Sequence, residues 1–134
     1  MRPASLAGLV AELSDDSDLV LCEGVMGLFD GANVAPGQAD GSTADLAALT
    51  GWPVVLVADV RGMAGSAAAL LRGFMSHRAE VMVAAALFNR VGGPGQRVML
   101  RRGCRAALPE LPILGLLPRE GTLDLPSRHL GLIQ

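Results

Sequence analysis

Two carboxylates flank a glycine-rich turn in the stretch LVLCEGVMGLFDGAN, residues 19–33. Glu23 follows four apolar residues, and Asp30 comes seven positions later. Magnesium in proteins is held by one or two carboxylates together with phosphate oxygens, and glycines let backbone approach a ligand closely. The spacing therefore suits a magnesium and phosphate site. It suits equally an acid that caps a helix or pairs with an arginine at Glu23, and plain Asp-Gly turn chemistry at Asp30.

Two further groups of residues could bind ligands. Ser42 and Thr43 precede a helical pattern, where free backbone amides can hold a phosphate or carboxylate. A plain helix cap without a ligand is the simpler interpretation and the one these residues alone favour. Asn89 ends a predicted strand, where its amide could pair with a purine edge or satisfy a local turn.

Other polar residues carry weaker indications. Asp59 and Arg61 could form a surface ion pair, and His77 and His129 lack the spacing of metal ligands. Cys104 lies among arginines, which would lower the pKa of its thiol. No histidine or aspartate pattern beside Cys104 indicates a nucleophile.

The elements that must position these groups follow from the apolar pattern. Helices are predicted within residues 4–18, 42–51, 62–78 and 92–108, and buried strands within residues 19–22, 52–60, 80–91 and 111–119. Residues 120–134 are predicted to be irregular or briefly helical. Strands that alternate with helices indicate an α/β fold of three layers, a mainly parallel sheet flanked by helices. Ligands of such sheets bind beyond the carboxyl ends of the strands, where Glu23, Asp59, Asn89 and Pro118 stand.

Composition narrows the function classes. The 134 residues have a net charge of −2, which argues against a nucleic-acid partner. No apolar run reaches the ~18 residues of a membrane span, and the two cysteines show no CxxC spacing, so a reduced cytoplasmic setting is expected. All 11 basic residues are arginines, so the chain has no lysine for a P-loop of the GxxxxGK[ST] type.

Several segments in order resemble the cobyrinic acid a,c-diamide synthase family. They are EGVMGLFDG, STADLAALTGWPVVLVADVRGMAGSAAALLRGF, FNRVGGPG, LGLLPR and LPSRHLGL. The likeness runs from about residue 18 to residue 132. One departure is Ser127, where members of the family often have glutamate.

The resemblance implies an activity. Enzymes of this family amidate the a and c carboxylates of cobyrinate or hydrogenobyrinate in cobalamin biosynthesis, with ATP, Mg²⁺ and glutamine, through acyl-phosphate intermediates. Their ATP-binding domain resembles dethiobiotin synthetase, a P-loop NTPase fold, and a separate glutaminase domain supplies ammonia. The resemblance thus implies a carbon–nitrogen ligase with glutamine as amido donor.

The resemblance also implies roles for particular residues. Glu23 corresponds to the acid at the ATP–magnesium site, and Asp30 to a second catalytic and metal-binding acid near the transferred phosphate. Asn89 corresponds to the residue that contacts adenine, and Pro118 lies on the loop that borders it. Ser42 and Thr43 are expected to face the carboxylates of the corrin substrate.

Parts of the family pattern are missing from these 134 residues. The P-loop strand and helix are expected before residue 1 and the glutaminase domain after residue 134. Residues 1–134 are therefore predicted to form a single partial domain, inactive alone, with an exposed sheet edge that favours a homo-oligomer. The rival hypotheses are a non-catalytic corrinoid- or partner-binding module and another ligase that resembles dethiobiotin synthetase.

Overall fold

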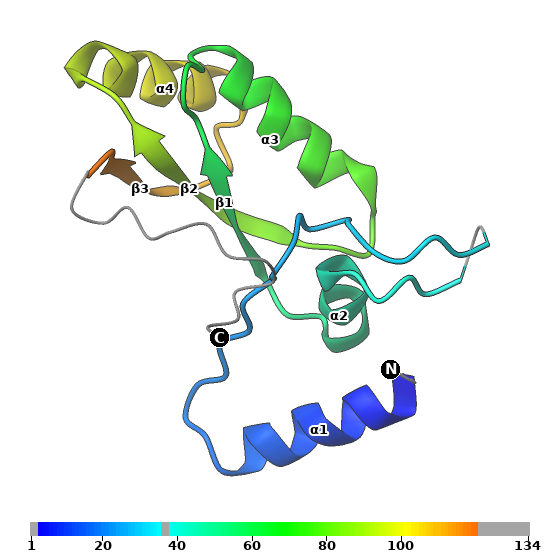
Figure 1. Ribbon diagram of the computed structural model, residues 1–134. Helices are drawn as coiled ribbons and strands as arrows, with labels where there is room; N and C mark the ends of the chain where they lie inside the picture. The colour runs from blue at the N-terminus through cyan, green and yellow to red at the C-terminus, as the bar shows by residue number, and fades with distance from the viewer. Residues whose placement is uncertain (1–2, 36–37, 121–134) are drawn as a thin grey trace, which may run out of the picture. The chain divides into compact units, whose positions relative to one another are not determined.

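The computed structural model of the protein describes residues 3–35 and 38–120. They form two compact units, one within residues 1–52 and the other within residues 53–120. Figure 1 labels the helices and strands of both. The predicted irregular tail lies outside the described residues, and so do Ser127 and His129. A single domain over residues 1–134 stays a prediction.

The first unit contains two helices, α1 (Pro3–Asp15) and α2 (Thr43–Thr50), which contact each other. The sequence predicted both. Ser42 caps the start of α2, and Gly51 ends it in the left-handed conformation with its N–H bonded to the carbonyl of Ala47. No helix among the described residues is both long and apolar enough to cross a membrane.

The strand predicted at residues 19–22 is wrong. These residues form no strand, and the side chains of Leu19 and Leu21 are 83% and 90% exposed. An apolar run becomes a buried strand only when a neighbouring strand pairs with its backbone and other elements cover its side chains. The described residues of this unit contain no other strand. Glu23 therefore follows a segment without regular secondary structure, with Leu19 and Leu21 exposed, rather than a buried strand.

The second unit alternates strands and helices in the order β1 (Val54–Asp59), α3 (Ser66–His77), β2 (Val83–Val91), α4 (Pro94–Ala107) and β3 (Ile113–Pro118). Its three strands form a parallel sheet in the order β1-β2-β3. Parallel strands need a crossover between them, and α3 and α4 supply the two crossovers. Pro94 opens α4 at a position where a missing N–H costs nothing, as the sequence predicted.

The core of this unit lies between the sheet and its two helices, which pack against each other (Figure 1). Phe88 of β2, Leu71 of α3 and Leu100 of α4 are fully buried there. Along β1, Leu56 and Ala58 are buried, whereas Val55 and Val57 alternate with them and are exposed.

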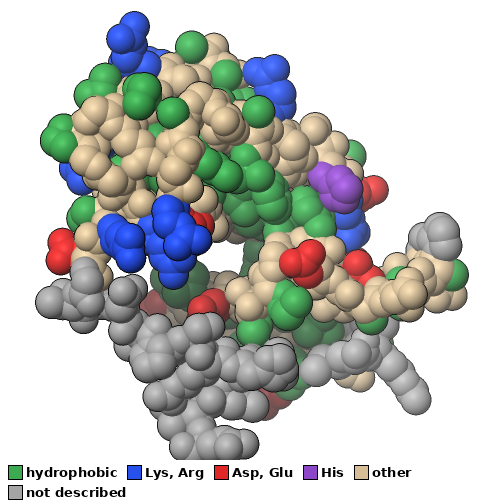
Figure 2. Space-filling view, turned by 45° about the horizontal axis from the view of Figure 1, so that its top comes forward, with side chains coloured by type: hydrophobic (Ala, Val, Ile, Leu, Met, Phe, Trp, Pro, Cys, Tyr) green, Lys and Arg blue, Asp and Glu red, His purple; other side chains and the backbone are tan. Residues whose placement is uncertain are grey.

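The α/β class, with a parallel sheet flanked by helices, is confirmed. The described residues contain neither a P-loop strand nor its helix. Within the described part of the second unit, no helix covers the sheet face that carries Val55 and Val57. Hydrophobic side chains also reach the surface elsewhere, as Figure 2 shows in green. A third layer would have to come from outside this unit.

Candidate functional site

Asp30 belongs to a tight turn that its own carboxylate closes. The N–H of Asp30 donates to the carbonyl of Gly27 at 3.0 Å, and the N–H of Gly27 donates back to Asp30 Oδ2 at 3.1 Å. A Cβ on residue 27 would collide with this carboxylate, so a larger residue there would displace the carboxylate from its bond to the N–H of residue 27. The turn chemistry left open for Asp30 is therefore present, and one oxygen of the carboxylate already has a partner.

The loop that carries Glu23 and Asp30 is fastened to the start of α2. The N–H of Ala44 donates to the carbonyl of Leu28 at 2.9 Å. Gly24 lies so close to Thr43 that a Cβ on residue 24 would stand 2.6 Å from Thr43 Oγ1. The structure thus brings the Glu23–Asp30 loop and the predicted substrate residues, Ser42 and Thr43, to one end of one helix. Glu23 itself is exposed.

The amides at the start of α2 are largely occupied by the protein. Ser42 Oγ accepts a hydrogen bond from the N–H of Asp45 at 3.3 Å, and the N–H of Ser42 donates to Asp40 Oδ1 at 2.9 Å. The N–H of Gly41 donates to Asp45 Oδ2 at 2.8 Å. Ser42 is therefore a helix cap with only 4% of its surface exposed. An anion here would compete with two carboxylates, so the assignment of Ser42 and Thr43 to the substrate remains a hypothesis.

The carboxyl ends of the strands in the second unit meet as the sequence predicted. Asp59 of β1 pairs in register with Asn89 of β2, and Val91 of β2 pairs with Pro118 of β3. The side chain of Asn89 accepts a hydrogen bond from the N–H of Arg90 at 2.9 Å, which is the local-turn alternative. Asn89 and Pro118 thus share one edge of the sheet, and their contact with a nucleotide stays a prediction.

The partner of Asp59 at this edge differs from the expected one. Its Oδ1 accepts the backbone N–H of Arg61 at 3.0 Å, but the ion pair joins Asp59 Oδ2 to Arg90 Nη1 at 3.0 Å. The Arg61 N–H, followed by the positive charge of Arg90, holds the pKa of Asp59 below 3.8. Sequence adjacency suggested Arg61, whereas the parallel register places Arg90 beside Asp59.

Arg90 has an unusual backbone. Its φ of 56° lies in the left-handed region, which is rarely occupied by residues other than glycine, asparagine or aspartate. Such strain costs about 1 kcal/mol or more and often occurs at functional sites.

The sequence did not reveal the role of Gln96. Its side-chain nitrogen donates to the carbonyls of Val60 and Met63, each at 2.7 Å, and its oxygen accepts the N–H of Gly92 at 2.6 Å. One side chain therefore ties the loop after β1 to the loop after β2. The available signal was a polar residue in the first turn of a helix that opens with Gly-Gly-Pro.

Burial, rather than the charge of nearby arginines, determines the pKa of the Cys104 thiol. The residue is 2% exposed on the inner face of α4, and this burial raises the pKa of its thiol. The expectation of a lowered pKa is therefore wrong. The nearby arginines are close in sequence, but they are exposed, whereas the side chain of Cys104 lies in the core.

Among the described residues, no group of three or more histidine, cysteine, aspartate or glutamate side chains could hold a metal ion. A cage built by the protein alone is therefore not present in that part of the chain. Magnesium is often bound by one or two carboxylates, with substrate phosphates and water as its other ligands. Exposed Glu23, and the second oxygen of Asp30, fit that smaller requirement.

Three parallel strands joined by helices, with the polar side chains of Asp59 and Asn89 near the carboxyl ends of two of them, define a parallel α/β domain of the kind that binds ligands at that edge. The chain is 45% identical over all of its 134 residues to the hydrogenobyrinate a,c-diamide synthase of Mesorhizobium japonicum. It is 46% identical to the enzyme of the same name from Brucella suis over its whole length, and 46% identical over 87% of its length to that of Mycobacterium tuberculosis.

These relatives confirm the resemblance to the corrin a,c-diamide synthase family. The chain spans only about 30% of the length of the Mesorhizobium and Brucella proteins, and it is homologous to that segment of them. No family model matches the chain. No solved structure matches it either.

Proposed function

We propose that this chain acts within a larger assembly as part of the synthetase site that amidates the a and c carboxylates of hydrogenobyrinate or cobyrinate. The observation that carries the proposal is 44–46% identity over the whole chain to enzymes named hydrogenobyrinate a,c-diamide synthase. The edge formed by Asp59, Asn89 and Pro118 supports it, because ligands of parallel α/β sheets bind there.

The proposed chemistry proceeds in two steps. A carboxylate oxygen of the corrin attacks the γ-phosphorus of ATP, and ADP leaves as the acyl phosphate forms. Ammonia derived from glutamine then attacks the acyl carbon, and inorganic phosphate departs. Phosphoryl transfer depends mainly on positioning and on neutralising charge. Magnesium, when bound, would supply part of that neutralisation.

In this proposal each residue has a limited task. Glu23 and Asp30 hold the magnesium ion with the phosphates of ATP, and the Gly27–Asp30 turn fixes the direction of the second carboxylate. Asn89 binds the adenine and Pro118 borders it. The chain has no lysine and no P-loop motif, so it depends on other residues to cradle the phosphates and is inactive alone.

The test is an assay of diamide formation by the larger assembly proposed above. The substrates are hydrogenobyrinate, ATP, Mg²⁺ and glutamine, and mass spectrometry detects the products. Glu23→Gln and Asp30→Asn should each abolish turnover, because each removes a charge from the magnesium site. Asp16→Asn removes another exposed charge of the same unit and should leave turnover unchanged.

Two results would contradict the proposal. Full turnover in both Glu23→Gln and Asp30→Asn would show that these acids are not part of the magnesium site. Amidation by the 134-residue chain alone would disprove its dependence on other residues.

Asn89→Ala should raise the KM for ATP more than it lowers kcat. An unchanged KM would show that Asn89 does not bind the nucleotide.

A further inference from the structure

Helix α4 concentrates positive charge on a chain whose net charge is negative. It carries four arginines and no acidic residue, while the whole chain has a net charge of −2. Arg101 and Arg105 are one helical turn apart, a spacing at which like charges destabilise a helix slightly. Among the described residues, neither of them forms an ion pair. Within the described part of the chain, α4 thus carries two guanidinium groups one turn apart that have no acidic partner.

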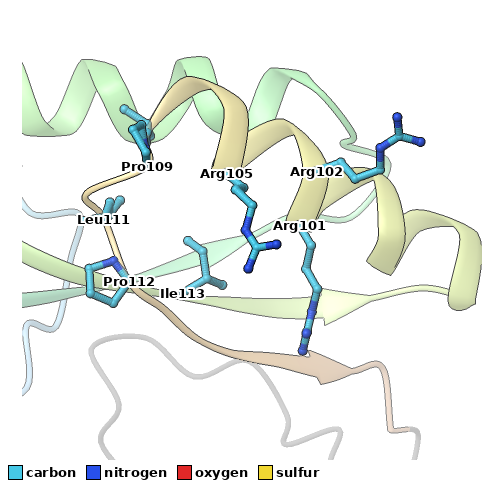
Figure 3. A pocket seen from close by; sticks show the side chains of 8 residues that line it. Arg101, Arg102, Arg105, Pro109, Leu111, Pro112 and Ile113 are labelled. Atoms are coloured by element: carbon cyan, nitrogen blue, oxygen red, sulfur yellow. The ribbon is translucent and has the colours of Figure 1, made fainter.

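These arginines border a pocket of about 380 Å³ between α4 and the beginning of β3. In Figure 3 the side chains of Arg101 and Arg105 extend from α4 toward β3, whereas Arg102, which also borders the pocket, extends in another direction. The opposite wall is apolar and is formed in part by Leu111, Pro112 and Ile113. The pocket therefore has a cationic side and an apolar side.

The pocket is distinct from the edge at which the nucleotide is proposed to bind. Ile113 begins β3 and Pro118 ends it, so the two sites lie at opposite ends of the same strand. The favourable interaction of Arg105 with the carboxyl end of α4 accounts for one cation in the last turn. It does not account for Arg101, which lies a full turn earlier.

We propose that the pocket between α4 and β3 binds a small anion, a phosphate or carboxylate group on an apolar body. Guanidinium groups pair well with both kinds of anion through two parallel hydrogen bonds. The apolar wall would cover the rest of the ligand. The volume lies in the range of small-molecule sites, which favours such a ligand over an acidic peptide.

Calorimetric titration of the 134-residue chain tests this proposal. The probes are phenyl phosphate and benzoate, which distinguish the two anions, with inorganic phosphate and benzyl alcohol as probes that lack one half of the ligand. We expect saturable binding of phenyl phosphate or benzoate, and weaker binding of both control probes. Arg101→Gln and Arg105→Gln should each weaken binding roughly fivefold, as expected for an exposed charge-assisted contact.

Arg97→Gln is the matched control, because it removes the same charge from an exposed arginine of the same helix that does not line the pocket. It should change the affinity less than about twofold. All three arginines are exposed, so the variants should fold, which circular dichroism checks. An equal loss in all three variants would indicate general charge attraction and overturn the proposal. So would absence of saturable binding, equal binding of either control probe, or tighter binding of an acidic peptide.

Discussion

Removing the side chain of Gln96 should break the hydrogen bonds that connect the loop after β1 to the loop after β2, at the carboxyl edge of the sheet. Gln96→Ala deletes three hydrogen bonds, to the carbonyls of Val60 and Met63 and to the N–H of Gly92. Val60 is fully buried, so water cannot easily replace the bond to its carbonyl, whereas Gly92 is exposed. The first two bonds contribute about 1 kcal/mol each and the third about 0.5 kcal/mol, so the free energy of unfolding should fall by about 2–3 kcal/mol.

Thermal and urea unfolding, followed by circular dichroism, measure this change. For a unit of this size, 1 kcal/mol corresponds to roughly 4–8 °C, so the Tm should fall by roughly 10–20 °C. Arg97→Ala changes the exposed neighbour on α4 and should alter stability by less than about 0.5 kcal/mol.

A second variant separates the two halves of the Gln96 side chain. Gln96→Glu keeps the acceptor for the N–H of Gly92 but turns a carboxylate oxygen toward two carbonyl oxygens. It should destabilise the protein at least as much as Gln96→Ala. Wild-type stability in Gln96→Glu, or equal effects of Gln96→Ala and Arg97→Ala, would refute the reasoning.

Four other predictions concern stability, reactivity and assembly. The pKa of Asp59 is lowered in the folded state, so the contribution of its carboxylate to stability is present above pH 3.8 and is lost as the pH falls through the folded pKa. Because both partners of the Asp59–Arg90 ion pair are about half exposed, this contribution is under about 1 kcal/mol. Urea unfolding across that range should show the loss in the wild type and not in Asp59→Asn. Ser42→Ala removes the cap of α2 and should cost about 1 kcal/mol, whereas Ser42→Asp should cost less. A thiol reagent should modify exposed Cys22 quickly and buried Cys104 only after unfolding. Light scattering should show a dimer or higher oligomer, which Val57→Lys should weaken, because Val57 is 61% exposed on the sheet face that no helix of the described second unit covers.

Each of these four can fail in a defined way. If Asp59→Asn loses stability at low pH as the wild type does, other carboxylates are responsible for that loss. An unchanged melting curve for Ser42→Ala would mean that the cap bond is not significant. Rapid labelling of Cys104 in a folded Cys22→Ser variant would show that the thiol is accessible. A monomer at high concentration would contradict the predicted assembly.

Local patterns were sufficient to predict most elements of the fold. Ser42 and Gly51 bound α2, and Pro94 opens α4, because capping depends on residues within one turn of the helix end. The three observed strands coincide with apolar runs predicted as strands. The same criterion failed at residues 19–22, because a strand also needs the backbone of another strand, and an apolar run does not show whether one is there.

The candidate site was predictable to the extent that it depends on the ends of parallel strands. Asp59 and Asn89 were expected at one edge, and the register places them opposite each other. The ion pair of Asp59 with Arg90 joins residues 31 positions apart, and Gln96 reaches carbonyls 33 and 36 positions away. Such contacts depend on how two loops meet after folding, which neighbouring residues in the sequence do not reveal.

The sequence by itself determined the α/β class, the caps of α2, the polar ends of the strands and the resemblance to the corrin a,c-diamide synthases. These properties depend on hydrophobic periodicity, on short-range hydrogen bonds and on residue identity. Only the tertiary structure decided that Cys104 is buried away from its arginine neighbours, that Arg90 rather than Arg61 pairs with Asp59, and that Arg101 and Arg105 face an apolar wall. The physical reason is that burial and long-range pairing depend on which face of an element meets another element.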